Sequence, residues 1–195
     1  KLSGFIVYSK ELFDYYSKSN YQTTNAVLIQ ERIKIEEPSN LNTKQSSKNS
    51  FTIFIAMRFS KEKYNMFLNL FKELNKINHN IEITLIIAGG GLFKEKIENL
   101  FVGLKSNIIL KFLGEIKKIE LINKNIVEAD LIVGHGRGII EAIAFKKVIF
   151  LLSFNKTGST LVNSENIEII SKYNFSGRGF DFTSSKNISL SYYLN

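Results

Sequence analysis

The central part of the chain, residues 51–152, alternates between two patterns of apolar residues. Residues 51–57 (FTIFIAM) are almost all apolar and rich in β-branched and aromatic types, which predicts a buried strand. In residues 61–77, apolar positions such as Phe67 and Phe71 recur at steps of three or four, so one face of a helix is predicted. The same two patterns then repeat up to the end of this region.

The repeats predict five strands separated by four helices. Further strands are expected at 81–88, 108–113, 130–133 and 148–152. Further helices are expected at 93–104, 116–124 and 138–145. Strands that alternate with helices form parallel sheets, because each helix carries the chain back to the starting edge of the sheet. We therefore predict an α/β fold, an open parallel sheet with helices on both faces.

A smaller region precedes this unit. Apolar runs predict short strands at 4–8 and 26–29, and a helix is expected between them at 10–17. Ser9 is the expected N-cap of that helix, because a serine hydroxyl can accept a hydrogen bond from the first-turn N–H groups.

The segments on either side of the central unit are more polar. Residues 38–50 (PSNLNTKQSSKNS) have Leu41 as their one large apolar residue, and we interpret them as a linker or loop. After the unit, a helix is predicted at 165–172. Residues 174–195 are polar with scattered aromatics and show no clear period.

Composition excludes several classes of protein and site. The 195 residues contain no Cys, which excludes disulfides, thiolate zinc sites and cysteine nucleophiles, and the two distant histidines, His79 and His135, predict no metal site. Hydrophobic residues make up 44% of the chain, so general disorder is excluded. No apolar run reaches the roughly 20 residues that a membrane-spanning helix needs. The chain starts at Lys1 rather than Met, and we interpret it as a fragment.

The formal net charge is +8, from 26 basic and 18 acidic side chains. Residues 51–150 carry a net +5 of this charge, with lysines and glutamates interleaved on the predicted helix faces, which is typical of a solvated surface. Nucleic-acid binding is not favoured, because it needs a clustered basic stripe with base-stacking aromatics, and the aromatics here fall in apolar patterns. A bias toward an acidic ligand or an anionic membrane surface stays open.

Three groups of residues directly follow predicted strands, where open parallel sheets bind their ligands. Arg58 and Lys63 follow the first strand of the central unit. Two cations at the start of a helix can bind a phosphate, or they can be surface residues only. Gly89, Gly90 and Gly91 follow the second strand, where they let the backbone approach a ligand or simply form the turn.

The third group follows the fourth strand and leads into a helix. Its members are Gly134, His135, Gly136, Arg137, Gly138 and Glu141. The free N–H groups of a helix start can bind an anion, and the arginine adds charge there. The glutamate can accept hydrogen bonds from two ribose hydroxyls, or it can be a helix N-terminal residue favoured by the macrodipole. The histidine is a candidate donor or base. Together the three groups suit a nucleoside diphosphate.

These segments resemble the donor-binding half of GT-B glycosyltransferases of the large group-one family. Residues 56–63 (AMRFSKEK) are similar to the family's G-R-L…K-G segment. Residues 85–91 (LIIAGGG) resemble its strand with a G-x-G turn, and 109–114 (ILKFLG) its strand that ends in F-x-G. Residues 129–147 resemble the strand–G-x-G–helix segment with E-A-x-A-x-G-x-P. The resemblance extends over about residues 4–180.

The resemblance implies roles for individual residues. Arg58 and Lys63 would contact the donor pyrophosphate, and Glu141 would hold the ribose hydroxyls. The family's first carboxylate, eight residues before that glutamate, is replaced by Val133. His135, a candidate catalytic residue, and Arg137 are then expected to make the donor-sugar contacts instead.

The resemblance also implies an organisation and an activity. Four regions are expected: the end of an acceptor-side domain with its crossover (1–37), a linker or loop (38–50), a Rossmann-like nucleotide-sugar donor-binding domain (51–180) and a C-terminal tail (181–195). The complete bacterial enzyme would transfer a sugar from a nucleoside-diphosphate sugar, expected to be a UDP-sugar, to a cell-surface glycan or related acceptor, without a cofactor or metal. The acceptor domain is missing, so the fragment is expected to be inactive. The expected location is the cytoplasm, with peripheral association at the inner face of the membrane.

Two alternatives stay open at this point. A sugar-nucleotide epimerase of the same fold would bind a similar donor without a separate acceptor. A non-catalytic nucleotide-binding module is also compatible with the replacement at Val133. An NAD-type dehydrogenase is disfavoured, because no G-x-G-x-x-G follows the first strand of the central unit.

Overall fold

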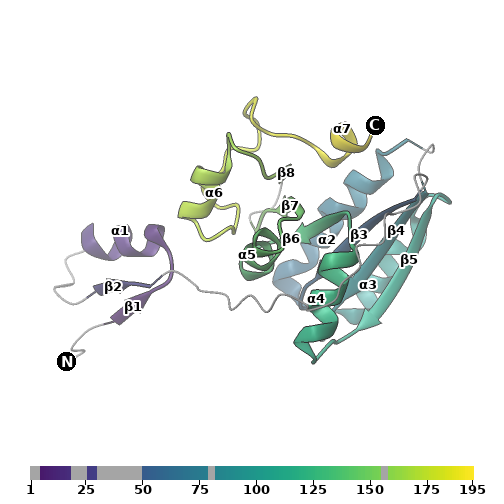
Figure 1. The fold of residues 1–195 in the computed structure, drawn as a ribbon, viewed down its shortest axis with the longest axis horizontal. Coiled ribbons are helices and arrows are strands. Elements are labelled where there is room, and N and C mark those ends of the chain that lie inside the picture. Colours follow the sequence, from purple (N-terminus) through teal and green to yellow (C-terminus); the bar gives the residue numbers. More distant parts are fainter. Residues whose placement is uncertain (1–4, 19–25, 30–49, 79–81, 155–157) are drawn as a thin grey trace.

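In the computed structural model of the chain, the described residues are 5–18, 26–29, 50–78, 82–154 and 158–195. They form a six-stranded sheet flanked by helices and a two-stranded unit near the N-terminus (Figure 1). The strands of the large sheet lie in the order β5-β4-β3-β6-β7-β8. Their bounds are β3 Ser50–Ala56, β4 Glu82–Ala88, β5 Ile108–Gly114, β6 Leu131–Gly134, β7 Val148–Leu152 and β8 Ser159–Leu161.

The predicted parallel sheet is confirmed. The five predicted strands, β3 to β7, pair in parallel with their neighbours. A sixth strand, β8, joins the edge antiparallel to β7, with Leu161 opposite Phe150. The sequence did not predict β8, because three residues with one large apolar side chain carry no strand pattern.

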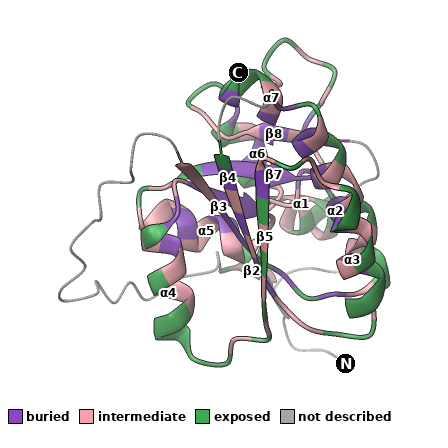
Figure 2. Ribbon diagram, turned by 90° about the vertical axis from the view of Figure 1, so that its right-hand side faces the viewer, coloured by how far each residue is buried: buried purple, intermediate pink, exposed green. Residues whose placement is uncertain are grey.

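Helices cover both faces of the sheet, as predicted. Apolar residues of α2, α3 and α7 pack on one face, and those of α4, α5 and α6 on the other. Alternate strand residues supply the two cores, so that Ile53 and Ile55 lie on the first face while Phe54 lies on the second. Figure 2 shows this layering, with buried strands between helices whose outer sides are exposed. The helix bounds are α2 Lys61–Asn75, α3 Lys94–Leu100, α4 Ile119–Glu128, α5 Arg137–Ala144, α6 Ile167–Lys172 and α7 Leu190–Leu194.

Two predicted helices differ in extent from those observed. The helix expected at 93–104 is α3 followed by a 3₁₀ turn, Phe101–Gly103. The helix expected at 116–124 begins later, at Ile119, because the chain is still extended at Lys118. Apolar spacing alone did not distinguish this extended stretch from a first helical turn.

Asp130 aligns β3 with β6 at the amino-terminal edge of the sheet. Its backbone N–H donates to the carbonyl of Thr52 at 2.9 Å, and its carboxylate accepts from the N–H of Thr52 at 2.7 Å. A charge-assisted hydrogen bond of this kind is among the stronger ones in proteins. The carboxyl ends of the same two strands are therefore held in a fixed register, with Ile55 opposite Val133.

The N-terminal unit consists of β1 (Phe5–Val7), α1 (Lys10–Lys18) and β2 (Ala26–Leu28), and its two strands are parallel. The predicted N-cap is confirmed, because the hydroxyl of Ser9 accepts from the N–H of Leu12 at 3.3 Å. The linker predicted at 38–50 lies outside the described residues apart from its last residue, which opens β3.

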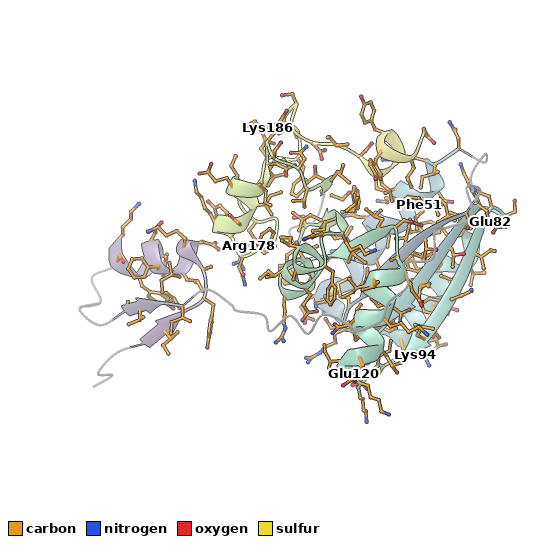
Figure 3. The ribbon with its side chains drawn as sticks, in the orientation of Figure 1. Phe51, Glu82, Lys94, Glu120, Arg178 and Lys186 are labelled. Carbon is orange, nitrogen blue, oxygen red and sulfur yellow. The ribbon has the colours of Figure 1, made fainter. Side chains whose placement is uncertain are left out.

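An ion pair connects α1 with the segment that follows α6. A guanidinium nitrogen of Arg178 lies 2.7 Å from a carboxylate oxygen of Glu11, and both side chains are partly exposed. Figure 3 shows Arg178 on the side of this segment that faces α1. Partly exposed pairs of this kind contribute at most about 1 kcal/mol, so the pair does not by itself fix the N-terminal unit.

The last part of the chain carries a helix where the sequence has no periodic pattern. Leu190 and Leu194 of α7 are buried against the core on the α2 face. The carboxylate of Glu73 in α2 accepts from the backbone N–H of Leu190 at 3.1 Å and from the Lys76 ammonium at 2.7 Å. Five residues are too few for a hydrophobic period, which is why the segment read as a polar tail. Within the parts of the chain that the structure describes, no helix has the length and apolar character to cross a membrane.

We expect Leu190→Ala to lower the free energy of unfolding by about 2–5 kcal/mol, because it leaves a cavity under a fully buried leucine. Tyr192→Ala in the same helix is the matched control, and it should change stability by less than about 0.5 kcal/mol, because the tyrosine is 79% exposed. Urea unfolding, monitored by circular dichroism, gives the free energy of unfolding of both variants. Equal effects of the two substitutions would show that α7 is not packed as described.

Candidate functional site

The strand order reverses between β3 and β6, because the chain runs outward from β3 to β4 and β5 and then returns to β6 on the other side. Ligands of open α/β sheets bind in the crevice at the carboxyl ends of two such strands. A cavity of about 340 Å³ lies there. It is lined by Ala56, Met57, Arg58, Lys63, His135, Arg137, Gly138 and Glu141.

The segment after β3 presents Arg58 to this cavity. Met57 and Phe59 on either side are buried, and the Phe59 ring packs edge-on against Phe67 of α2 with centroids 5.4 Å apart. Because neighbouring side chains in extended backbone point in opposite directions, burying both neighbours directs the arginine outward. Its exposed guanidinium therefore stands at the cavity wall.

Lys63 enters the cavity from the first turn of α2. Burial, followed by the nearby charge of Arg58, holds the pKa of its ammonium below the usual value, while Glu62 acts in the opposite direction. Two cations thus share a partly desolvated space. A bound anion would relieve this repulsion, so the pair favours a negatively charged ligand.

The turn between β6 and α5 shapes the opposite wall. Gly136 has a φ of +58° and a ψ of −131°, a combination that favours glycine, and its N–H donates to the carbonyl of Phe175 at 2.7 Å. This hydrogen bond anchors the turn to the segment after α6. The helix then begins at Arg137, so that the positive end of its dipole points toward the cavity.

Arg137 and Glu141 form an ion pair one helical turn apart. The arginine Nε donates to a glutamate carboxylate oxygen at 2.9 Å. The arginine is largely exposed, whereas only 17% of the glutamate side chain is accessible. The pair therefore orients the more buried carboxylate at the cavity wall. The sequence had singled out both residues for separate roles, and the structure joins them.

His135 lines the same cavity as the cations. Burial, and then the positive charge of Lys63, lowers the pKa of the imidazole to about 4, so the ring is neutral at pH 7. Its Nε2 is shielded from solvent and, within the described part of the chain, has no hydrogen-bond partner. The ring also packs against Phe154, with centroids 6.2 Å apart. A buried imidazole nitrogen without a partner is available for a ligand.

A second cavity of about 250 Å³ adjoins the first and shares Ala56, Met57 and Arg58 with it. The further lining residues are Ala88, Gly89, Gly90, Glu115, Ile116 and Ile122. Sequence reasoning missed Glu115, Ile116 and Ile122. Glu115 and Ile116 directly follow Gly114 at the end of β5. Their position after a predicted strand was the signal in the sequence that could have identified them. This cavity is the more apolar part of the site.

Two of the three consecutive glycines act mainly through packing. A Cβ atom at Gly89 would lie 2.1 Å from the carbonyl oxygen of Met57 and 2.6 Å from the Phe59 ring. Gly91 has a φ of +136°, and a Cβ atom there would lie 2.4 Å from the Phe59 carbonyl. Backbone hydrogen bonds complete the contact, from Met57 N–H to Ala88 and from Phe59 N–H to Gly90. Gly89 and Gly91 are thus required by the turn, while Gly89 and Gly90 also line the second cavity.

The structure thus brings most of the predicted site residues to one crevice. Six of them line the first cavity: Arg58, Lys63, His135, Arg137, Gly138 and Glu141. Gly134 is instead buried at the end of β6, where it pairs with Leu151. Val133 is buried in the core beneath the site. Across the described residues, no cluster of three potential metal-ligating side chains is found.

Comparison with known proteins identifies the architecture. No protein-family model matches the sequence, and no curated protein matches it. Among solved structures, TarM aligns with a TM-score of 0.54 and 22% identity, and the lipopolysaccharide outer core galactosyltransferase WaaB with a TM-score of 0.53 and 15% identity; each match covers 75% of this chain. The fold is that of GT-B glycosyltransferases.

The GT-B-like chain spans only part of these structures. It covers 28% of the TarM chain and 42% of the WaaB chain. A mutant of S. aureus TarM, solved in complex with Fondaparinux, α-GlcNAc-glycerol and UDP, aligns with a TM-score of 0.52 and 21% identity over 75% of this chain and 29% of its own. At these identities the likeness establishes the fold, and the Rossmann-like, open parallel sheet predicted from the sequence is confirmed.

We expect Gly89→Ala to destabilise the GT-B-like domain by about 1–3 kcal/mol, because the added methyl group collides with the backbone of Met57. Gly138→Ala is the contrasting substitution. It has open space around the new Cβ and lies in α5, so it should be neutral or stabilising by up to about 1 kcal/mol. Thermal unfolding of both variants measures the difference. Equal stability would contradict the packing role of Gly89.

Proposed function

We propose that the chain is the donor-binding part of a glycosyltransferase and binds the nucleoside diphosphate of a nucleotide sugar in the crevice between β3 and β6. The observation that carries this proposal is the lining of the 340 Å³ cavity, where Arg58, Lys63 and the start of α5 face one oriented carboxylate. The GT-B-like fold supports it, since glycosyltransferases share that fold.

The diphosphate is assigned to Arg58 and Lys63. The two cations crowd each other, and a dianion between them would replace their repulsion with attraction. The N–H groups at the start of α5 add hydrogen-bond donors on the other side. In glycosyl transfer the negative charge on the diphosphate grows as the bond to the sugar breaks, so the same groups would stabilise the leaving group. In this proposal Arg58 and Lys63 stabilise the leaving group, and no resident cofactor is needed.

The nucleoside is assigned to Glu141 and the second cavity. The glutamate carboxylate, oriented by Arg137, would accept hydrogen bonds from the ribose hydroxyls. The base would occupy the adjoining cavity, whose walls include the apolar side chains of Ile116 and Ile122. Because the two cavities share Arg58, a single nucleotide can extend from one to the other. His135 and Arg137, which also line the first cavity, would contact the donor sugar.

Calorimetric titration with UDP tests the site, with GDP, CDP and dTDP as comparisons for the base. We expect binding of UDP, and Glu141→Gln should weaken it by about 1–3 kcal/mol, because the ribose loses a charged acceptor. Glu128→Gln is the matched control. It changes the same side chain in the last turn of α4, next to the amino-terminal edge of the sheet, and should leave the affinity unchanged. Absence of binding by any of the four nucleotides would refute the proposed function.

An acceptor-side domain is the proposed partner of the N-terminal unit. Ile6 and Val27 in its two parallel strands, and Tyr8 and Ile29 directly after them, each have between 43% and 58% of their surface exposed. Parallel strands are normally covered on both faces, and a two-stranded sheet has little stability alone. We propose that an acceptor-side domain covers this apolar face, and that a cell-surface glycan or related acceptor binds between the two domains.

We therefore expect the 195-residue chain to bind UDP without transferring sugar. The acceptor groove and the groups that face the donor from the other domain would be absent, so proximity and orientation of the acceptor are lost. Incubation with radiolabelled UDP-glucose, UDP-galactose and UDP-N-acetylglucosamine and simple glycan acceptors should give no labelled product. Transfer by the isolated chain would contradict the need for a second domain.

A further inference from the structure

His135 occupies an unusual position within the cavity. It lines the same cavity as three cations from different segments, which are Lys63 of α2, Arg137 of α5 and Arg58 after β3. The one acidic side chain among the lining residues, Glu141, is engaged with the arginine of its own helix. From the segment after β7 the imidazole meets the uncharged ring of Phe154. The charged groups that face it are therefore mostly positive.

This environment keeps the imidazole neutral while no anion is bound. Burial lowers its pKa, and the ammonium of Lys63 lowers it further, to about 4. The Nε2 atom is buried and, among the described residues, no hydrogen-bond partner reaches it. Around the ring, the described residues supply neither an unpaired negative charge, because Glu141 is paired with Arg137, nor a hydrogen-bond acceptor for Nε2.

A diphosphate would supply both at once. Its charge offsets that of Lys63 and Arg58, and its oxygens can accept from the ring N–H groups. Both effects favour the protonated form, so they act against the effect of burial. We propose that His135 takes up a proton from solvent when a nucleoside diphosphate enters the cavity, and binds it as an imidazolium. This inference rests on the proposed function and adds a coupling between donor binding and pH.

The coupling has a definite sign. A group whose pKa is higher in the complex than in the free protein binds a proton on complex formation, so affinity is greater at low pH and falls as pH rises through the pKa of the complex. A rise of one unit in the pKa corresponds to about tenfold tighter binding by the protonated protein. Release of the nucleoside diphosphate would return the proton to solvent.

The test follows the histidine ring signals by NMR between mildly acidic and neutral pH, with and without saturating UDP. The chain has two histidines, so the signal that disappears in His79→Gln belongs to His79, and the signal that disappears in His135→Gln belongs to His135. In the wild-type chain we expect the His135 ring to be neutral throughout the range without UDP and to titrate with UDP, a rise in pKa of at least about one unit. The ring of His79 should show no such change.

Calorimetry gives a second readout. UDP titrations in buffers of different ionisation enthalpy yield the protons exchanged per UDP bound. The terminal phosphate of UDP titrates in the same range, so the comparison is between the wild-type chain, His79→Gln and His135→Gln. We expect the first two to take up more protons than the third. UDP binding with a His135 ring that stays neutral, and with equal proton exchange in all three proteins, overturns the inference and leaves the proposed function intact. Absence of UDP binding overturns both.

Discussion

The position of Arg58 depends on the close packing of residues 57–59 against the glycine turn after β4. Backbone hydrogen bonds join the two segments, and two of the glycines leave no room for a side chain between them. The Phe59 ring continues the contact into an aromatic cluster with Phe67, Phe101 and Phe112. The guanidinium is therefore placed by the core itself. A loop held in this way can present a charge at a fixed point without losing much entropy when a ligand binds.

The site combines this rigidity with an unfavourable concentration of positive charge. Arg58, Lys63 and Arg137 line one cavity of a chain that is already basic, and the neutral imidazole of His135 lines the same cavity. Burial, and after it the charge of Arg58, holds the pKa of Lys63 below its usual value. Binding sites commonly contain ionisable groups with shifted pKa values, because the bound ligand supplies the charge that the free site lacks. The carboxylate of Glu141 offsets part of the repulsion through its pair with Arg137.

Sequence patterns predicted the sheet well because its strands are buried on both faces and therefore read as continuous apolar runs. They also placed Arg58, Lys63 and Glu141 at strand ends, where topology brings distant segments together. The patterns could not reveal β8 or α7, since these elements take their stability from tertiary contacts such as the one between Glu73 and Leu190. Nor could they show that Gly89 is needed for close packing, since that depends on the carbonyl of Met57 after a different strand.

The contact between α2 and α7 affects the order in which the core of the domain can form during synthesis. Helix α2 is synthesised well before residues 190–194, which pack against it. Until those residues leave the ribosome, apolar side chains on the α2 face lack part of their cover and Glu73 lacks one of its partners. Contacts between such distant segments form late and slow folding. Residues 190–194 can therefore complete the core on the α2 face only after the sheet has been made.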